Sequence, residues 1–341
     1  MGKAPHRVTL EDVARLAQTS TITVSRALRR PEMVSEKLRN RIAAAVAELG
    51  YVPDPAASAL ASRRSNVIGV LIPSVTNNVF AEVLTGLYET IAGKPFNVQL
   101  GNTRYSAEIE AELIRVFLSQ RPAGLIVTGV DQSPAARILL DAADCPIVQI
   151  MELSDDPVDM LVGFSHRDGA RTATEHLIEQ GYQAPAFLGA RMDPRSERRL
   201  QGFRDALTAA DIAEGNRVVT TNTPSSVALG EPLLTRLLEQ APETDAIFCN
   251  NDDLALGVQF AAHRRGIEIG QSLGLCGFND LEVMAAAHPS ITSVRTFRRE
   301  MGQQAIEMLL ARIEDTEPGP AIRDLEYRLM PRDSTSRHGT T

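Results

Sequence analysis

Two pairs of side chains in this sequence could support acid or base chemistry. Asp252 and Asp253 are adjacent, and His166 lies two positions before Asp168. Asp252 also fits the N-cap of a helix, and neither pair is accompanied by a nucleophile motif, a metal-ligand spacing or a phosphate-binding loop. We therefore expect no enzyme, no cofactor and no metal site, which leaves a binding function.

Other polar side chains recur directly after short apolar runs. They are Ser74, Asn77, Asn102, Glu152, Arg191 to Arg199, Asn250 to Asp253, Asn279 and Asp280. Ligands of open parallel sheets bind beyond the carboxyl ends of the strands, so these groups are candidate pocket residues. Their hydrogen-bonding capacity suits a polyhydroxylated ligand and would be costly to bury unpaired.

The apolar runs themselves predict the elements that position these groups. Expected strands are Val67 to Ile72, Asn97 to Leu100, Gly124 to Val127, Ile147 to Ile150, Ala186 to Gly189, Ala246 to Cys249 and Leu273 to Cys276. Expected helices include Phe80 to Ala92, Ala107 to Ser119, Asp168 to Glu179 and Asp252 to Arg264. This alternation predicts parallel sheets covered by helices, and it occurs twice, before and after about Gly163. We expect two similar lobes.

The first 52 residues predict three short helices instead. Thr9 and Asp12 suit a capping box for a helix from Leu10 to about Ala17, and Ser20 can cap a second helix to about Leu28. The inner faces are expected to be Leu10, Val13, Ala14 and Ala17, then Val24 and Leu28, then Leu38, Ile42, Val46 and Leu49 of a third helix that begins near Ser35 and is capped by Gly50. Two short helices joined by so tight a turn favour a helix-turn-helix. The segment after Pro53 predicts a helix too short to be stable alone.

The composition of the chain indicates what kinds of partner it can bind. The chain has 341 residues, 43% of them hydrophobic, and its net charge of −8 divides into +5 for residues 1–64 and −13 for the remainder. A basic head on an acidic body indicates that the head meets a polyanion. Cys145, Cys249 and Cys276 are expected to be reduced core residues. No signal peptide or stretch of about 18 apolar residues is found, so we expect a soluble cytoplasmic protein.

Three ordered strings resemble the lactose-repressor family, and the similarity continues to PRDST at Pro331 to Thr335. They are VTLEDVARLAQTSTITVSRAL (Val8 to Leu28), ELGYVPDPAASALAS (Glu48 to Ser62) and SNVIGVLIPSVTNNVFAEVLTGL (Ser65 to Leu87). The resemblance implies an all-α helix-turn-helix headpiece with a hinge helix, followed by a periplasmic-binding-protein-like α/β body. The implied domains are 1–52, the hinge and linker 53–65, and the effector-binding and dimerisation body 66–341, with lobe 1 at about 66–163 plus 296–323 and lobe 2 at about 164–295 plus 324–341.

The resemblance also implies which residues meet DNA. Thr21, Ile22 and Arg26 would face base edges in a major groove. Thr21 could make a single hydrogen bond, Ile22 an apolar contact to a thymine methyl, and Arg26 a bidentate contact to guanine. The full implied set is Thr9, Ser20, Thr21, Ile22, Thr23, Ser25, Arg26 and Arg29, with Ala57 and Leu60 of the hinge in the minor groove. In the alternative, Ile22 is core, Arg26 clamps phosphate and Leu60 packs on the body. Gln18 stands where the family usually has Gly, which puts the turn in question.

In the body, the resemblance implies effector contacts at Phe80, Glu152, Arg199, Asn251, Asn279 and Arg298, and the positions after strands add Ser74, Asn77 and Arg195 to the expected ligand-binding residues. Asn279 replaces an Asp of many relatives and Arg298 an aromatic ring, and both changes favour a carboxylate-bearing ligand. RRPEMVS, LGARMDPR and FCNNDDLA resemble the gluconate-utilisation repressors, so gluconate or a close sugar acid is expected. Alternatively, Arg298 pairs with Glu300 or with an acidic residue across the cleft.

These expectations describe a homodimeric repressor that binds a palindromic operator and is released by its ligand. The family's leucine heptads for tetramers are absent, so we expect a dimer. A co-repressor-type or neutral-sugar-responsive regulator of the same family is the nearest rival. A sugar-binding transport protein needs the two lobes but has no use for residues 8–62.

Overall fold

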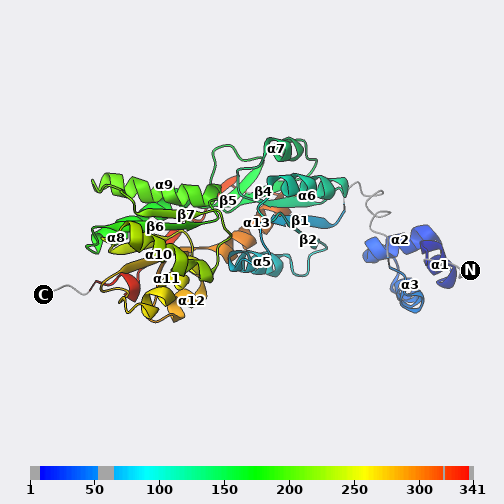
Figure 1. Ribbon diagram of the computed structural model, residues 1–341. Coiled ribbons are helices and arrows are strands. Elements are labelled where there is room, and N and C mark those ends of the chain that lie inside the picture. Colours follow the sequence, from blue (N-terminus) through cyan, green and yellow to red (C-terminus); the bar gives the residue numbers. More distant parts are fainter. Residues whose placement is uncertain (1–7, 53–64, 318, 338–341) are drawn as a thin grey trace, which may run out of the picture. The chain divides into compact units, whose positions relative to one another are not determined.

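The computed structural model describes residues 8–52, 65–317 and 319–337 (Figure 1). The chain separates into two compact units, Met1–Ser65 and Asn66–Thr341. The expected hinge positions Ala57 and Leu60 lie outside the described residues. The two units are described below one after the other, as the headpiece and the body.

The headpiece contains three helices and a short 3-10 turn. They are α1 (Leu10–Leu16), α2 (Thr21–Arg29), the turn Pro31–Met33 and α3 (Glu36–Leu49). The capping box is confirmed, since Asp12 N–H donates to Thr9 Oγ1 over 3.3 Å and Thr9 N–H donates to the Asp12 carboxylate over 3.0 Å. Ser20 likewise caps α2, because its Oγ accepts from Thr23 N–H. Gly50 ends α3 in the left-handed conformation, as expected.

A small apolar core joins the three helices. Its buried members are Val13, Ala14, Ala17, Val24, Ala27, Ile42 and Ala45. The expectation that Leu28 is buried is wrong, because 38% of it is exposed and Ala27, one position earlier, faces the core. One position is a turn of about 100° around a helix, so only the packing against the other helices decides between the two.

The turn between α1 and α2 adopts the conformation that Gln18 made questionable. Gln18 has a φ of 49°, in the left-handed region. Thr19 N–H donates to Ala14 O over 2.9 Å, and Arg41 of α3 donates to Gln18 O over 3.3 Å. These bonds cap the carboxyl end of α1 and fix the turn. Because Gln18 has a positive φ, glycine would adopt this position at lower conformational cost.

Lobe 1 of the body is a six-stranded parallel sheet. Its order is β11 (Ile322–Asp324), β5 (Met160–Gly163), β4 (Ile147–Ile150), β3 (Gly124–Thr128), β1 (Val67–Ile72) and β2 (Asn97–Asn102). The helices α5 (Asn78–Ile91) and α13 (Arg298–Ile313) cover one face, and α6 (Ala107–Ser119) and α7 (Pro134–Asp141) cover the other. The sheet is thus buried on both sides, as a parallel sheet requires.

Lobe 2 repeats this design with one difference. Its order is β12 (Tyr327–Met330), β10 (Thr292–Thr296), β9 (Gly274–Asn279), β8 (Ala246–Cys249), β6 (Pro185–Ala190) and β7 (Val218–Thr221). β12 runs antiparallel to β10, whereas the other pairs are parallel. The helices α8 (His166–Glu179) and α9 (Pro194–Ala209) cover one face, and α10 (Gly230–Gln240) and α11 (Asp252–Arg264) cover the other, with the short α12 (Glu282–Ala286) after β9.

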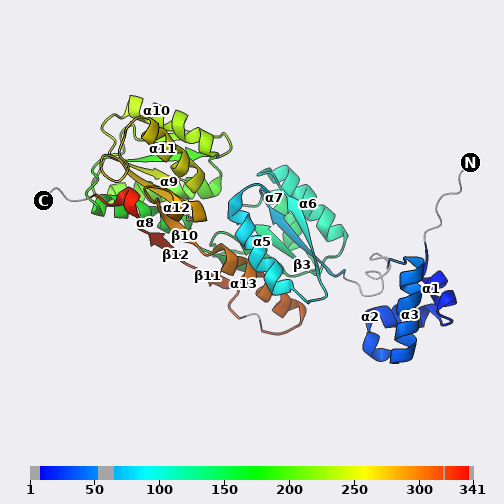
Figure 2. The ribbon, with the colours of Figure 1, turned by 90° about the horizontal axis from the view of Figure 1, so that it is seen from below.

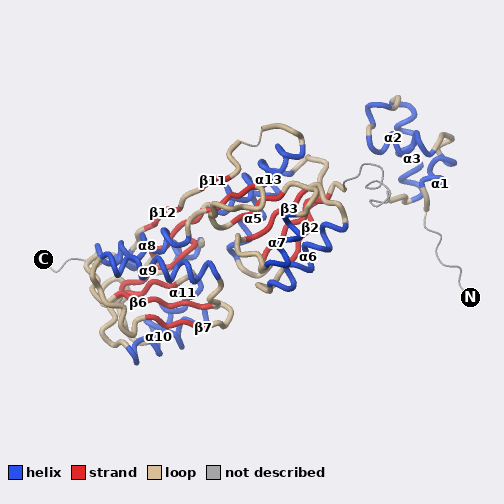
Figure 3. The backbone as a smooth tube through the Cα atoms, turned by 90° about the horizontal axis from the view of Figure 1, so that it is seen from above, coloured by secondary structure: helices blue, strands red, loops and turns tan. Residues whose placement is uncertain are grey.

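The chain passes between the lobes three times. The crossings lie between β5 and α8, between β10 and α13, and between β11 and β12 (Figures 2 and 3). Each lobe has one tightly packed helix pair, α5 with α13 and α8 with α9. A Cβ on Gly302 would lie 2.0 Å from Val83 O, and one on Gly202 would lie 2.0 Å from Arg167 O. The close approach of these backbones therefore requires glycine.

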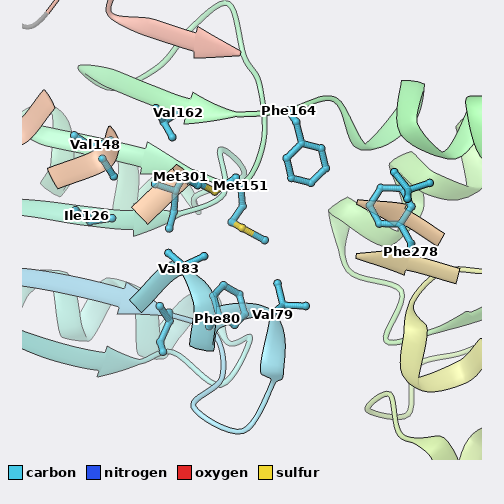
Figure 4. Packing of buried hydrophobic residues seen from close by; sticks show 14 of the residues in the cluster. Val79, Phe80, Val83, Ile126, Val148, Met151, Val162, Phe164, Phe278 and Met301 are labelled. Carbon is cyan, nitrogen blue, oxygen red and sulfur yellow. The ribbon is translucent and has the colours of Figure 1, made fainter. Parts of the chain in front are cut away.

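One apolar cluster continues from lobe 1 into lobe 2. Val79, Phe80 and Met151 approach from lobe 1, and Phe278 stands on the lobe 2 side (Figure 4). Phe164, at the first crossing, lies 6.3 Å from Phe278 between ring centroids. The two lobes therefore share buried surface at the point where their strands end.

Candidate functional site

The exposed face of α2 carries the side chains expected to read DNA. Ile22 is 69% exposed, so the alternative that it belongs to the core is wrong. Thr21 and Arg26 are exposed as well, whereas Thr23 and Ser25 are partly buried. Thr9 and Ser20 serve as the caps of α1 and α2. An exposed isoleucine next to threonine and arginine offers apolar, single-bond and bidentate contacts on one helix.

A cavity of about 70 Å³ lies in the body where strands of both lobes end. Lobe 1 lines it with Asn77, Val79, Phe80, Tyr105 and Met151. Lobe 2 lines it with Ala190, Arg191, Asp193, Arg195, Ser196, Arg199, Ser225, Asn251, Asp252, Asp253, Asn279 and Leu281. Helix starts and strand ends thus supply nearly all of its polar groups, as in other open α/β sheets.

Three strands reach this cavity through unusual backbone. Met151 after β4 has a φ of 82°, Arg191 after β6 has 48°, and Asn279 at the end of β9 has 112°. Positive φ is costly for residues with a Cβ and is typical of ligand sites, where surrounding packing holds it in place. These three residues therefore adopt costly backbone conformations at the positions where they line the cavity.

Arg199 of α9 is the most buried cation of the cavity. Its Nε donates to His166 Nδ1 over 3.1 Å, its guanidinium also donates to Asn250 O, and it stacks on Phe278 at 3.9 Å from the ring centroid. His166 Nε2 lies 2.7 Å from Met151 O, so the ring is neutral with the proton on Nε2. Burial holds the pKa of His166 well below its usual value, with the charge of Arg199 acting in the same direction.

In the part of the chain that the structure describes, Arg199 has no carboxylate within ion-pair distance. Burial lowers its pKa to about 10, which still leaves it charged at neutral pH. A buried cation held only by neutral acceptors is a costly arrangement unless an anion joins it. The cavity is therefore prepared for an anionic group beside Arg199.

Two further arginines flank the same space. Arg191 stacks on Tyr105, with its guanidinium carbon 3.9 Å from the ring centroid. Arg195 pairs with Asp193 over 3.1 Å, and Asp193 also caps α9. The Tyr105 hydroxyl accepts from Asn77 Nδ2 over 3.2 Å. Burial raises the pKa of the Asp253 carboxyl, which belongs to the same lining. Asp193 matches the charge of Arg195, so the positive charge of Arg191 and Arg199 faces Asp252 and Asp253.

Asp252 opposes this charge only in part. Its carboxylate accepts from Ser293 Oγ over 2.6 Å and from Leu281 N–H over 2.7 Å. Burial, the larger influence, raises its pKa to about 6. The N-cap of α11 is Asn251 and not Asp252, since Asn251 Oδ1 accepts from Leu254 N–H over 3.1 Å. Asp252 is thus a buried structural acceptor between β10 and the loop after β9.

Six of the nine expected effector residues line the cavity: Asn77, Phe80, Arg195, Arg199, Asn251 and Asn279. Asn279 Oδ1 is buried and lacks a hydrogen-bond partner among the described residues, so a ligand hydroxyl can donate to it. Asn251 Oδ1 also accepts from Ser225 Oγ over 2.9 Å. These amides add hydrogen bonding beside the arginines.

The other three lie outside the lining. Ser74 is held in its loop, where its Oγ accepts from Thr76 N–H over 3.2 Å. Glu152 is buried, and its carboxylate lies 3.5 Å from Arg198 Nε.

Arg298 is the third residue outside the lining. It pairs with Glu82 of α5 over 2.7 Å and donates to Asn279 O, so it supports a cavity residue from behind. Glu82 therefore neutralises the charge of Arg298. The expected pairing of Arg298 with Glu300 or with an acidic residue across the cleft is wrong, since Glu82 belongs to α5 of the same lobe.

Sequence reasoning missed Tyr105, Ser225, Met151 and Leu281. Tyr105 comes from the loop after β2, and its contribution depends on stacking with Arg191 from the other lobe. Met151 directly follows β4 and only the rule for strand ends could have suggested it.

No group of three or more His, Cys, Asp or Glu side chains in the described ranges could hold a metal ion. None of the described helices is long and apolar enough to cross a membrane. Of the cysteines, Cys249 and Cys276 are buried and Cys145 is partly buried.

Comparison with known proteins matches both units. Residues 9–54 match the model of bacterial regulatory proteins of the lacI family, and residues 174–335 match the periplasmic binding protein-like domain. The HTH-type transcriptional regulator GntR of Pseudomonas aeruginosa is 40% identical over 96% of this chain and 96% of its own length.

Two solved structures are similar over nearly the whole chain. A LacI-family transcriptional regulator from Silicibacter pomeroyi has a TM-score of 0.91 at 36% identity, over 97% of this chain and all of that one. The lac repressor dimer bound to operator and an anti-inducer has a TM-score of 0.82 at 27% identity, over 97% and 99%. This chain is a DNA-binding transcription regulator that belongs to the LacI family.

Proposed function

We propose that this regulator is a repressor of sugar-acid catabolism and that a gluconate-type acid binds in the cavity between its lobes. The observation that carries the proposal is Arg199, a buried guanidinium with no carboxylate partner in the described chain. A carboxylate can accept two parallel N–H bonds from a guanidinium, which a neutral hydroxyl cannot. The similarity to a regulator named GntR supports the same ligand class.

The remaining lining suits the polyhydroxylated part of such an acid. Asn279 Oδ1 is a free acceptor, and Phe80 supplies an apolar surface on the lobe 1 side. A sugar acid has both hydroxyl donors and C–H faces, so both kinds of contact are satisfied. Binding across both lobes would favour their closed arrangement.

On the DNA side, we assign base reading to Thr21, Ile22 and Arg26 of α2. Ser20 and Thr23 at the start of the helix can contact phosphate, as helix N-termini commonly do. A homodimer would place two copies of α2 on the half-sites of a palindromic operator. The related lac repressor was solved as a dimer on its operator, which supports this assembly.

Control of DNA binding by the acid is a linkage between two sites. If the acid prefers the state with weak operator affinity, DNA must weaken acid binding by the same factor. The expected sign is release of the operator by the acid. A co-repressor would show the opposite sign.

The experiment is fluorescence anisotropy of a labelled operator selected from random DNA. The full-length protein is titrated onto it, and sugar acids and neutral sugars are then added separately. Release by sugar acids alone supports the proposal, and tightening supports the co-repressor alternative. Ligand binding without any change in operator affinity contradicts it and favours a transport-type binding role.

A further inference from the structure

A second cavity lies beside the first. Its volume is about 220 Å³, against about 70 Å³ for the cavity at Arg199. Strand ends of lobe 1 line it through Thr103 and Thr128, and the start of α6 closes it with Ser106 and Glu110. The start of α9 in lobe 2 completes it.

The two cavities share Tyr105, Asp193 and Arg195 as a common wall. The wall is built from side chains, with Arg195 5.9 Å above the Tyr105 ring centroid. Small-molecule pockets usually measure roughly 300 Å³ or more. The first cavity alone is far below that size, whereas the two together approach it. A six-carbon acid held at Arg199 therefore needs room in the second cavity for the rest of its chain.

The second cavity has more acidic than basic side chains in its lining, with Glu110, Asp131 and Asp193 against Arg195, whereas the first has three of each. Its neutral hydrogen-bonding groups are Thr103, Tyr105, Ser106, Thr128 and Gln132. Gln132 is fixed by an Nε2 bond to Gly129 O over 3.0 Å and by a bond from Gln149 over 2.8 Å. Its arginine, Arg195, is already paired with Asp193. Glu110 is the remaining carboxyl without an ion pair among the described residues of the lining, since Asp131 pairs with Arg198 over 2.6 Å.

We propose that the second cavity holds the hydroxyl-bearing end of the acid and that Glu110 selects a chain ending in an uncharged hydroxymethyl group over one ending in a second carboxylate. The proposal rests on the proposed function, because it takes the first carboxylate to lie at Arg199. An anion placed in a half-buried space beside another carboxylate is repelled more strongly than in water. A neutral hydroxyl instead finds acceptors and donors there.

The selection should depend on pH. Burial raises the pKa of Glu110 to about 7, while its bond with Gln132 and the charge of Arg195 act weakly in the other direction. The charged groups facing it are Arg195 of α9, Asp193 at the N-cap of α9 and Asp131 in the loop after β3, and these are paired as described. Below pH 7 Glu110 is mostly neutral and repels little. Above pH 7 it is ionised and repels a second carboxylate.

The test is isothermal titration calorimetry of the full-length protein with gluconate and with glucarate, its dicarboxylate counterpart. It compares the wild type, Glu110→Gln and the matched control Glu112→Gln, which changes an exposed residue of the same helix. Wild type at about pH 8 should bind gluconate at least about tenfold more tightly than glucarate, and less selectively at about pH 6. Glu110→Gln should lose most of this preference at both pH values, and Glu112→Gln should keep it.

The inference is overturned if, at about pH 8, Glu110→Gln retains the wild-type preference for gluconate or the wild type binds gluconate and glucarate equally. Failure of the proposed function has a different signature. In that case gluconate does not bind the wild type at all, while a neutral sugar does.

Discussion

The two lobes of the body share a design but contribute different chemistry to the cavity. Each has a six-stranded sheet in the same spatial order and a pair of helices whose backbones touch at glycine. Lobe 2 supplies every charged side chain of the lining, three arginines and three aspartates, whereas lobe 1 supplies an aromatic and apolar surface and the amide of Asn77. The charged part of the ligand is therefore assigned to lobe 2 and the uncharged part to lobe 1.

Two of the arginines of lobe 2 contact lobe 1 directly. Arg191 from lobe 2 is held over Tyr105 from lobe 1, and Arg198 from α9 makes a two-bond contact with Asp131 of lobe 1 at 2.6 and 2.7 Å. Arg191 and Arg198 therefore make these contacts across the lobes, whereas Arg199 keeps its contacts within lobe 2. On the proposed function, ligand binding and lobe closure would be coupled through Arg191 and Arg198.

The largest expected effect comes from Arg199→Gln. It removes the cation of lobe 2 that we assign to the ligand carboxylate, and gluconate affinity should fall by at least about 100-fold. Arg204→Gln changes an exposed arginine of the same helix, paired with Glu214, and should leave affinity unchanged. Calorimetry measures both. Equal affinity in Arg199→Gln and wild type, with both folded by circular dichroism, would contradict the assignment to lobe 2.

The next effect concerns Asp252 of lobe 2, because burial raises the pKa of its carboxyl group to about 6. Since the folded-state pKa lies above the unfolded value, the wild type loses stability as the pH rises from about 4 to about 6. Asp252→Asn removes this loss, so its free energy of unfolding relative to wild type should increase over that window by at most about 3 kcal/mol. Urea unfolding at several pH values measures it.

Exposed Asp211→Asn serves as the control for that series and should show a constant difference from wild type. A constant difference for Asp252→Asn as well would mean that Asp252 does not titrate in this range.

A smaller effect is expected at the contact between lobes. Arg198→Gln removes the ion pairs with Asp131 and Glu152 but leaves Arg199 in place. Because the pair is partly exposed, we expect gluconate affinity to fall by roughly tenfold or less. The comparison with Arg199→Gln separates lobe closure from direct contact. If Arg198→Gln weakens binding more than Arg199→Gln does, closure and not the carboxylate contact dominates.

The smallest expected effect lies in the headpiece and provides a contrast to the strained backbone of the cavity. Gln18→Gly relieves a left-handed residue that no ligand requires, and thermal unfolding should show a gain of up to about 1 kcal/mol. Ala44→Gly, on the exposed side of α3, should lose about 1 kcal/mol. A loss in Gln18→Gly would show that the glutamine side chain contributes to the turn.

Much of the fold could be predicted from the sequence because the central strands are continuous apolar runs. β1, β4 and β8 have the expected ends. β5, β7 and β10 were not predicted. In β7 and β10, threonine, serine and arginine interrupt the apolar run that revealed the short β4 and β8, whereas β5 is apolar throughout and was overlooked. β11 and β12 were missed because their partly exposed residues derive their pairing from strands far away in sequence.

The site was predictable where it follows strand ends and not where it depends on contacts between lobes. Asn279 and Arg199 follow from position along the chain and from the family resemblance. Arg298 does not, because only the folded crossing places it against Glu82 and behind Asn279. Tyr105 likewise acquires its role from an arginine of the other lobe.

The central claim is that lobe 2 recognises a carboxylate, and one comparison of ligands tests it directly. Calorimetry of the wild-type protein with gluconate and with glucitol, the neutral polyol of the same chain length, isolates that group. The account predicts that gluconate binds at least about 100-fold more tightly. Equal binding of the two, or a preference for glucitol, would contradict it.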